Sequence, residues 1–125
     1  IDMVINVGYL KNEEDAVVLK QIKAVRKAAE NKILKVIVET CLLTEEEKIR
    51  VCELVTEGGV DYIKTSTGYS KAGAKLEDIA LFKEHIGENV KIKAAGGIRT
   101  REQMEAFLEA GCDRIGTSST SVLFD

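Results

Sequence analysis

The sequence lacks proline and tryptophan altogether, and only 5% of its residues are aromatic. Aromatic side chains are the platforms on which single-stranded nucleic acids stack, so their scarcity argues against that class of partner. The single histidine, His85, falls in a helical stretch, where it is a poor base for a nucleophilic cysteine. No set of His, Cys and carboxylate side chains has the spacing of a metal site, so we expect no metal.

Cysteine is also scarce, and the thiols of Cys41, Cys52 and Cys112 have no paired spacing. An odd number of unpaired cysteines is typical of a reducing compartment, which predicts a cytoplasmic protein, and Cys52 and Cys112 suit core positions. Cys41 follows a predicted strand and could lie near a pocket. No apolar run approaches the roughly 18 residues of a membrane span, and a net charge of -3 is unlike a nucleic-acid-binding surface.

What the chain does have is enough apolar side chains, 45% of 125 residues, for one domain with its own core. We therefore treat residues 1–125 as a single domain. The chain opens without methionine and with the pattern of a strand interior, which predicts a piece of a longer protein.

Short β-rich runs alternate with longer stretches whose apolar residues recur every three or four positions. The predicted strands are 1–7, 33–38, 60–64, 90–94 and 114–117. Capping boxes at Thr44 and Thr100 open two of the intervening helices, and Asn12 opens the first. Gly58 and Gly111 each close a helix. Because parallel strands need crossover helices, this order predicts an α/β fold with a parallel βαβαβαβαβ sheet.

An internal repeat favours a barrel over a doubly wound sheet. Segments 57–66 and 109–118 share Glu, Gly, Asp, Ile, Thr and Ser in register. A full (β/α)8 TIM barrel needs eight units and about 250 residues, so five strands amount to about half of one. A flavodoxin-like open sheet is the alternative, although Gly8-Tyr9-Leu10 stands where such a fold has a glycine-rich loop.

Three lysines stand inside predicted parallel strands, which usually carry Val, Ile and Leu because both faces are buried. They are Lys35, Lys64 and Lys93, spaced 29 residues apart in both steps. Burial and a neighbouring ammonium both disfavour charged lysine, and a Schiff-base nucleophile requires a neutral amine. Lys64 and Lys93 fall near the carboxyl ends of their strands, where barrel active sites are built. Alternatively, the lysines extend to solvent or pair with Glu39 and Asp2.

Glycines and small hydroxyl residues follow the last two predicted strands. Gly96 and Gly97 precede a helix, and Gly116, Ser118 and Ser119 follow the final strand. Backbone N–H groups, hydroxyls and a helix N-terminus can enclose a phosphate, and barrels most often hold phosphate in these two loops. The alternative is that the glycines make only a tight turn and the serines only cap a helix.

Two side chains of the first predicted strand could join this site. Asp2 could accept or relay a proton beside the lysines, or form only a structural ion pair with one of them. Asn6, at the carboxyl end of the same strand, could contact a substrate or satisfy a turn.

Together these segments resemble the deoxyribose-phosphate aldolases, class I enzymes with a (β/α)8 barrel. The matching motifs, in the family's order, are IDMVIN from residue 1, LKVIVET from 34, YIKTSTG from 62, KIKAAGGIRT from 91 and RIGTSS from 114. Tyr69 follows the third motif, where some members carry a lysine. The resemblance covers essentially the whole chain but only strands four to eight of the family barrel, which implies its C-terminal half.

The resemblance also implies roles for individual residues. Lys64 corresponds to the lysine that forms the Schiff base, Lys93 lies beside it and favours its neutral form, and Asp2 shares the proton relay. The implied phosphate and substrate contacts are Gly96, Gly97, Gly116, Ser118, Ser119, Thr65 and Asn6. The implied reaction is reversible cleavage of 2-deoxy-D-ribose 5-phosphate to D-glyceraldehyde 3-phosphate and acetaldehyde. The partner is then a small phosphorylated sugar or aldehyde, and no cofactor is needed beyond the lysine.

A second hypothesis is a non-catalytic half-barrel that serves as a folding or assembly module. In either case five strands leave two open edges, at 1–7 and 114–117, and we expect an uncovered inner face that carries Ile5 and Val36 or their neighbours. Apolar patches of that extent seldom stay exposed, so we expect self-association, most simply as a two-fold dimer.

Overall fold

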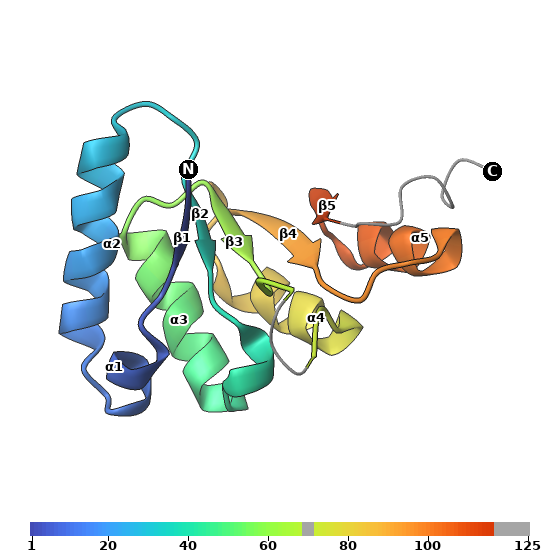
Figure 1. Ribbon diagram of the computed structural model, residues 1–125, viewed down its shortest axis with the longest axis horizontal. Helices are drawn as coiled ribbons and strands as arrows, with labels where there is room; N and C mark the ends of the chain where they lie inside the picture. The colour runs from blue at the N-terminus through green and yellow to red at the C-terminus, as the bar shows by residue number, and fades with distance from the viewer. Residues whose placement is uncertain (69–71, 117–125) are drawn as a thin grey trace.

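The computed structural model describes residues 1–68 and 72–116 as parallel strands that alternate with helices (Figure 1). The strands are β1 (Asp2–Val4), β2 (Lys35–Ile37), β3 (Tyr62–Lys64), β4 (Lys91–Ala95) and β5 (Arg114–Gly116). The helices are α1 (Val7–Lys11), α2 (Asp15–Ala29), the 3-10 turn η1 (Thr40–Leu42), α3 (Glu45–Glu57), α4 (Leu76–His85) and α5 (Arg101–Ala110). The predicted α/β alternation is confirmed, with strands shorter than expected.

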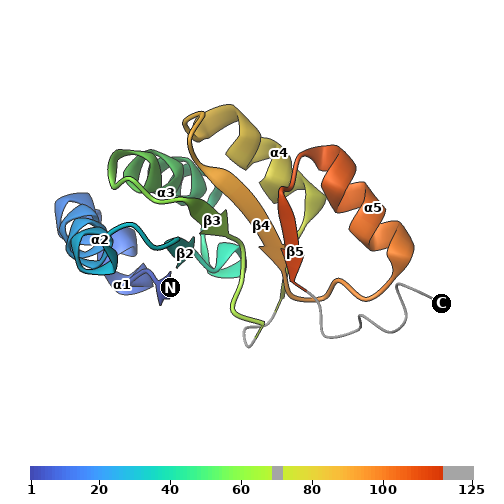
Figure 2. The same cartoon turned by 90° about the horizontal axis from the view of Figure 1, so that it is seen from above.

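The strands pair in the order of the chain, β1-β2-β3-β4-β5, and every pair is parallel. A doubly wound sheet reverses its strand order at a switch point, so this order excludes the flavodoxin-like alternative. Seen from above, the helices lie along one side of the curving sheet and leave its other side open (Figure 2). A sheet that winds in one direction inside a layer of helices is part of a (β/α)8 barrel, as predicted.

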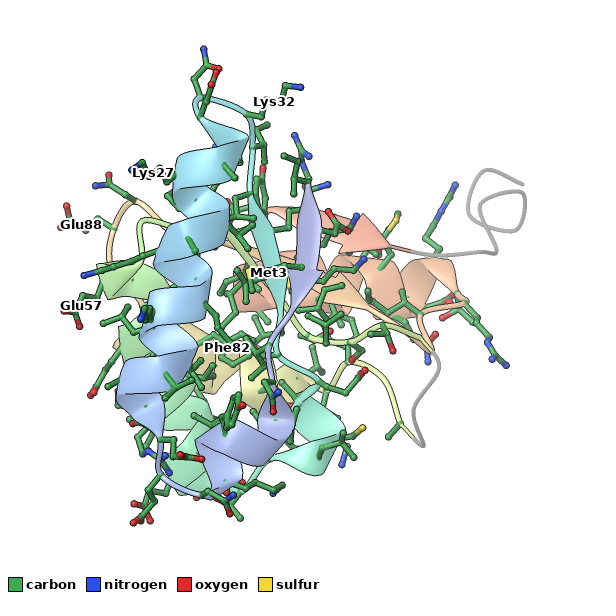
Figure 3. All side chains as sticks on the ribbon, turned by 60° about the vertical axis from the view of Figure 1, so that its left-hand side comes forward. Met3, Lys27, Lys32, Glu57, Phe82 and Glu88 are labelled. Atoms are coloured by element: carbon green, nitrogen blue, oxygen red, sulfur yellow. The ribbon has the colours of Figure 1, made fainter. Side chains whose placement is uncertain are left out.

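The core lies between the sheet and the helices. Val36 and Ile63 on neighbouring strands are fully buried, and Phe82 of α4 packs in the same cluster. In Figure 3, Phe82 lies among the side chains between helices and sheet, whereas Lys27 and Glu57 extend from the outer surfaces of α2 and α3. Each helix therefore buries one face and exposes the other, as expected for the outer layer of a barrel.

Strand alternation decides which side chains lie on the uncovered face. The expectation named Ile5 and Val36 or their neighbours, and Ile5 and Val36 are 4% and 0% exposed and belong to the core. Successive side chains of a strand point to opposite faces, so the uncovered face carries the residues in between. Val4, which is 51% exposed, and Lys35 lie there. The open face is consequently more polar than the predicted apolar patch.

The first helical region also differs from the prediction. Val7, expected to end the first strand, begins α1 instead, and the side chain of Asn6 caps that helix by accepting a hydrogen bond from the N of Tyr9 at 3.0 Å. Asn12, expected to open the first helix, ends α1, and α2 begins at Asp15. The cap at Asn6 starts a helix early because it satisfies an otherwise free N–H of the first turn.

The other helix boundaries follow their predicted signals. The Thr44 and Thr100 side chains each accept a hydrogen bond from the backbone N of the third residue of their helix, completing both capping boxes. Gly111 ends α5 with a φ of +117°, a value that favours glycine. Within the described ranges, no helix is long and apolar enough to cross a membrane.

Candidate active site

The face of the sheet opposite the helices carries a row of charged side chains. Lys64, Lys93 and Arg114 are partners in the register of β3, β4 and β5. Asp2 and Lys35 are partners on β1 and β2, two residues nearer the amino ends of the strands. Adjacent strands lie only about 4.8 Å apart, so these side chains are close neighbours. The three lysines predicted from their spacing therefore share one face.

Asp2 links two of the lysines. Its Oδ2 lies 3.5 Å from the Nζ of Lys64, and its Oδ1 lies 3.9 Å from the Nζ of Lys35. The Lys64 side chain is 15% exposed, so this amine is well sheltered from water. The ion pairing that the sequence allowed is confirmed for Asp2. The same distances put a carboxylate where it could exchange protons with the amine of Lys64.

Lys93 titrates in an unusual environment. Burial lowers the pKa of Lys93, and the positive charges of Lys64 and Lys35 lower it further. Asp2 acts in the opposite direction, and Arg114 adds a smaller lowering. Lys93 therefore loses its proton more readily than a lysine in water, which suits a group that passes protons. The predicted influence of Lys93 on Lys64 stays a prediction.

Sequence reasoning missed a cation–π cluster on the same face. The guanidinium carbon of Arg114 lies 4.8 Å from the centroid of the Tyr62 ring, and the Nζ of Lys91 lies 6.0 Å from it. Such contacts hold cationic side chains in place. Strand alternation could have identified Arg114, because it stands two residues before Gly116 and so shares its face.

The glycine loops form an open pocket at the carboxyl edge of the sheet. Its volume is about 590 Å³, and its lining residues are Gly68, Ala72, Gly73, Gly96, Gly97, Arg99, Thr100 and Gln103. Gly96 and Gly97 have φ values of +84° and +75°, which side chains disfavour. Thr100 is also the N-cap of α5, so a helix N-terminus adjoins the pocket. The structure thus brings Gly96 and Gly97 together in a place that suits an anion.

Two chain segments meet tightly at this pocket. A Cβ at Gly73 would lie 2.2 Å from the O of Gly96, so only glycine allows the approach. The N of Ala74 donates to the O of Ala95 at 3.0 Å and to the O of Gly96 at 3.1 Å. Gly73 and Ala74, just before α4, are therefore held against the loop after β4 by backbone contacts.

Thr65 joins β3 to β4. It is fully buried, and its hydroxyl donates to the O of Ala95 at 3.1 Å and accepts from the N of Ala95 at 3.0 Å. The predicted substrate contact of Thr65 stays a prediction.

The remaining predicted residues lie in different places. A Cβ at Gly116 would lie 3.3 Å from the Cε of Lys93, so this glycine leaves room beside the lysine. Asn6 is exposed and caps α1, which fulfils the alternative of a local structural role. Ser118, Ser119 and Tyr69 lie outside the described residues.

Glu39 was considered as a partner for the lysines, but the structure gives it a different one. Glu39 is 5% exposed and directly precedes η1. Its Oε1 accepts from the N of Thr67 at 3.0 Å, and its Oε2 accepts from the Oγ1 of Thr67 at 2.6 Å. Both carboxylate oxygens thus hold Thr67, which follows β3, and no local sequence signal predicts this contact.

The cysteines behave as structural thiols where burial is complete. Cys52 and Cys112 are 0% and 7% exposed and belong to the core cluster, which confirms their interpretation as core thiols. Burial raises the pKa of Cys52 to about 12 and that of Cys112 to about 11. Cys41 is half-buried in η1, and His85 ends α4. Among residues 1–68 and 72–116, no group of three or more His, Cys, Asp and Glu side chains could hold a metal ion.

The fold and the site define a half-barrel of the (β/α)8 class, with lysines on its open face and a glycine pocket at the carboxyl edge of its strands. A family model described as DeoC/LacD family aldolase matches residues 1–118, and the chain therefore belongs to this aldolase family. Deoxyribose-phosphate aldolase of Clostridium botulinum (strain Eklund 17B / Type B) is 61% identical over 118 residues, covering 94% of this chain and 53% of that protein.

Two further comparisons agree. Deoxyribose-phosphate aldolase of Clostridioides difficile (strain 630) is 56% identical over 119 residues, covering 95% of this chain and 54% of that protein. The solved structure of an aldolase designated QR15 superimposes with a TM-score of 0.92 at 41% identity, covering 98% of this chain and 55% of that one. The chain spans about half the length of the curated relatives it matches.

Proposed function

We propose that this chain is the catalytic half of a class I aldolase that cleaves 2-deoxy-D-ribose 5-phosphate reversibly to D-glyceraldehyde 3-phosphate and acetaldehyde. The observation that carries the proposal is the sheltered amine of Lys64, with Asp2 at 3.5 Å and Lys93 as its strand partner. The relatives named deoxyribose-phosphate aldolase support the choice of substrate.

The proposed chemistry needs one amine and a proton relay. The neutral amine of Lys64 attacks the substrate aldehyde carbon C1, water leaves, and a protonated imine forms. A base removes the proton of the C3 hydroxyl, the C2–C3 bond breaks, and its electron pair enters the imine to give an enamine. Glyceraldehyde 3-phosphate leaves, C2 takes up a proton, and water releases acetaldehyde and the free amine. Asp2 and Lys93 are the proposed proton carriers.

The glycine pocket is the proposed phosphate site. Gly96 and Gly97 line it, and the N-terminus of α5 and Arg99 add a favourable field for an anion. We include Gly116, Ser118 and Ser119 in this site because they belong to the RIGTSS motif that resembles the phosphate-binding segment of the family. The lysine forms a covalent bond with the substrate, so the proposed reaction needs neither a metal nor another cofactor. We propose a cytoplasmic location because the three cysteines are unpaired in spacing, as is typical of a reducing compartment.

The alternative is a non-catalytic half-barrel, favoured by one observation: the chain covers only about half of its relatives. Release of acetaldehyde from 2-deoxyribose 5-phosphate, coupled to NADH oxidation by alcohol dehydrogenase, distinguishes the two. We expect slow release that disappears in the Lys64→Ala variant. Equal release by the parent and this variant would reject the catalytic hypothesis.

A further inference from the structure

We propose that Glu39 is a positioning residue for the phosphate end of the substrate, because it holds Thr67 and thereby places Gly68, which lines the glycine pocket. The inference rests on the proposed function, in which this pocket receives the phosphate. No substrate contact was assigned to Glu39. It lies just after the end of β2, the strand that pairs with β3, which carries Lys64.

The contact between Glu39 and Thr67 uses both oxygens of the carboxylate. Both carboxylate oxygens accept hydrogen bonds from this one residue, at 3.0 Å from its N and at 2.6 Å from its hydroxyl. Hydrogen bonds to an ionised acceptor are stronger than neutral ones, and two of them fix both position and orientation. The contact spans 28 positions of sequence, so it sets the path of the loop relative to the neighbouring strand.

Thr67 leads directly into the pocket. The next residue, Gly68, lines the pocket and has a φ of +93°. A Cβ added at Gly96, another lining residue, would lie 3.8 Å from the Cα of Gly68 and 3.0 Å from the Cα of Gly73, so the three glycines are close neighbours. Glu39 therefore holds one end of the pocket wall, while the hydrogen bonds of Ala74 hold the other.

The position of Glu39 has two local costs. Its carboxylate is buried, and its φ of +54° lies in the left-handed region that residues with a side chain rarely adopt. Costs of this kind concentrate where a precise geometry serves function.

The lysine strand is held independently of this side chain. The O of Lys64 accepts from the N of Val38 at 3.0 Å, and the N of Thr65 donates to the O of Lys93 at 3.1 Å. These are backbone contacts of the sheet, which a change of the Glu39 side chain leaves in place. Loss of the carboxylate should therefore weaken phosphate recognition while the amine of Lys64 keeps its position.

The test compares 2-deoxyribose with 2-deoxyribose 5-phosphate. Each sugar is incubated with the full chain, the imine is reduced with borohydride, and the adduct on Lys64 is quantified against sugar concentration. In Glu39→Ala the half-saturating concentration of the phosphorylated sugar should rise about tenfold, with a smaller rise in Glu39→Gln, which keeps one acceptor oxygen. The value for the unphosphorylated sugar should stay unchanged.

Asp78→Asn is the matched control. Asp78 is another buried carboxylate, 2% exposed, and it accepts from the Nζ of Lys48 at 2.6 Å between α3 and α4; neither residue lines the pocket. Its loss should lower stability without changing the ratio between the two sugars. An equal effect of Glu39→Ala on both sugars, or no effect on either, would overturn the proposal.

A second measurement separates this proposal from the proposed function. If the parent forms no adduct with either sugar, the aldolase hypothesis fails, and binding of inorganic phosphate, followed by NMR, then decides the role of Glu39. Weaker phosphate binding by Glu39→Ala than by the parent and Asp78→Asn would support it. Equal binding by all three chains, or no phosphate binding by the parent, would overturn it.

Discussion

At the residue scale, Lys93 titrates in a field set by named neighbours. Its lowered pKa comes first from burial, then from the charges of Lys64 and Lys35, while Asp2 raises it. Replacing Lys64 with Met should therefore raise the pKa of Lys93, and Asp2→Asn should lower it further. NMR titration of isotope-labelled lysine side chains would measure both changes. Shifts in the same direction for the two variants would contradict this electrostatic account.

The residues that sequence could identify are those whose type conflicts with their local setting. Lys64 and Lys93 were recognisable because charged side chains are rare in parallel strands, and their shared face was then confirmed by the register. The role of Glu39 could not be predicted, because its partner Thr67 lies 28 positions away and the contact depends on a left-handed backbone. The burial of Thr65 was likewise invisible to a motif comparison.

At the scale of elements, acidic side chains join the helices. Arg50 of α3 is hydrogen-bonded to Asp15 of α2, and Lys11 of α1 is hydrogen-bonded to Glu47 of α3. These contacts join the helices, and they lower the pKa values of Asp15 and Glu47. A lowered folded-state pKa contributes stability above the unfolded value of about 4, which is lost as the pH falls through the folded value.

The parent should therefore lose stability below about pH 4. Asp15→Asn should be less stable than the parent at pH 7. The difference should narrow as the pH falls through the lowered pKa of Asp15, because the parent's carboxylate then takes up a proton and loses its charge. Urea denaturation at pH 7 and at successively lower pH, followed by circular dichroism, would measure the free energies of unfolding. A difference that widens in acid would show that this ion pair does not carry the acid sensitivity.

The internal repeat has a structural explanation at this scale. The Oδ2 of Asp61 accepts from the N of Leu34 at 2.8 Å, and the Oδ2 of Asp113 accepts from the N of Ile92 at 3.0 Å. Each aspartate ties the start of its strand to the preceding strand.

Asp113→Ala should cost about 1–3 kcal/mol, because it leaves the N–H of the buried Ile92 without this acceptor. Asp113→Asn should cost less, since its amide oxygen can still accept. Equilibrium urea unfolding of both variants would test this, and equal losses would argue against the hydrogen bond as the cause.

The helix boundaries show where local signals suffice. The boxes at Thr44 and Thr100 were correct because both partners of each box lie within one turn. The first helix was misplaced because Asn6 and Asn12 both carry cap-type side chains, and only the fold decides which of them caps a helix N-terminus.

At the scale of the whole molecule, the open face bears on assembly. In the described residues β1 pairs only with β2 and β5 only with β4, so each has an open edge. Exposed Ile1 and Val4 at one edge favour association, whereas apposed copies of Lys35 and Lys64 would repel.

We therefore expect self-association at protein concentrations of roughly tens of micromolar. Salt should strengthen it, because at an ionic strength of about 0.1 M the repulsion between charges more than about 10 Å apart is largely screened. Sedimentation velocity at low and high salt would measure it. A monomer under all conditions, or dissociation on addition of salt, would contradict this expectation.

The order of the strands could be predicted because alternating elements and the repeat admit few topologies. The side of the sheet on which Ile5 and Val36 lie could not be predicted from the sequence, because a shift of one residue exchanges the two faces of a strand. The uncovered face, which was expected to be apolar, therefore carries charged side chains such as Lys35, Lys64 and Lys93.

The central claim, that Lys64 is the Schiff-base lysine, is tested most directly by reducing the chain with borohydride in the presence of acetaldehyde and locating the adduct by peptide mapping. The account predicts one dominant adduct on Lys64, absent in Lys64→Ala and weaker in Lys93→Ala. An adduct spread evenly over exposed lysines such as Lys20, Lys23 and Lys27 would contradict it.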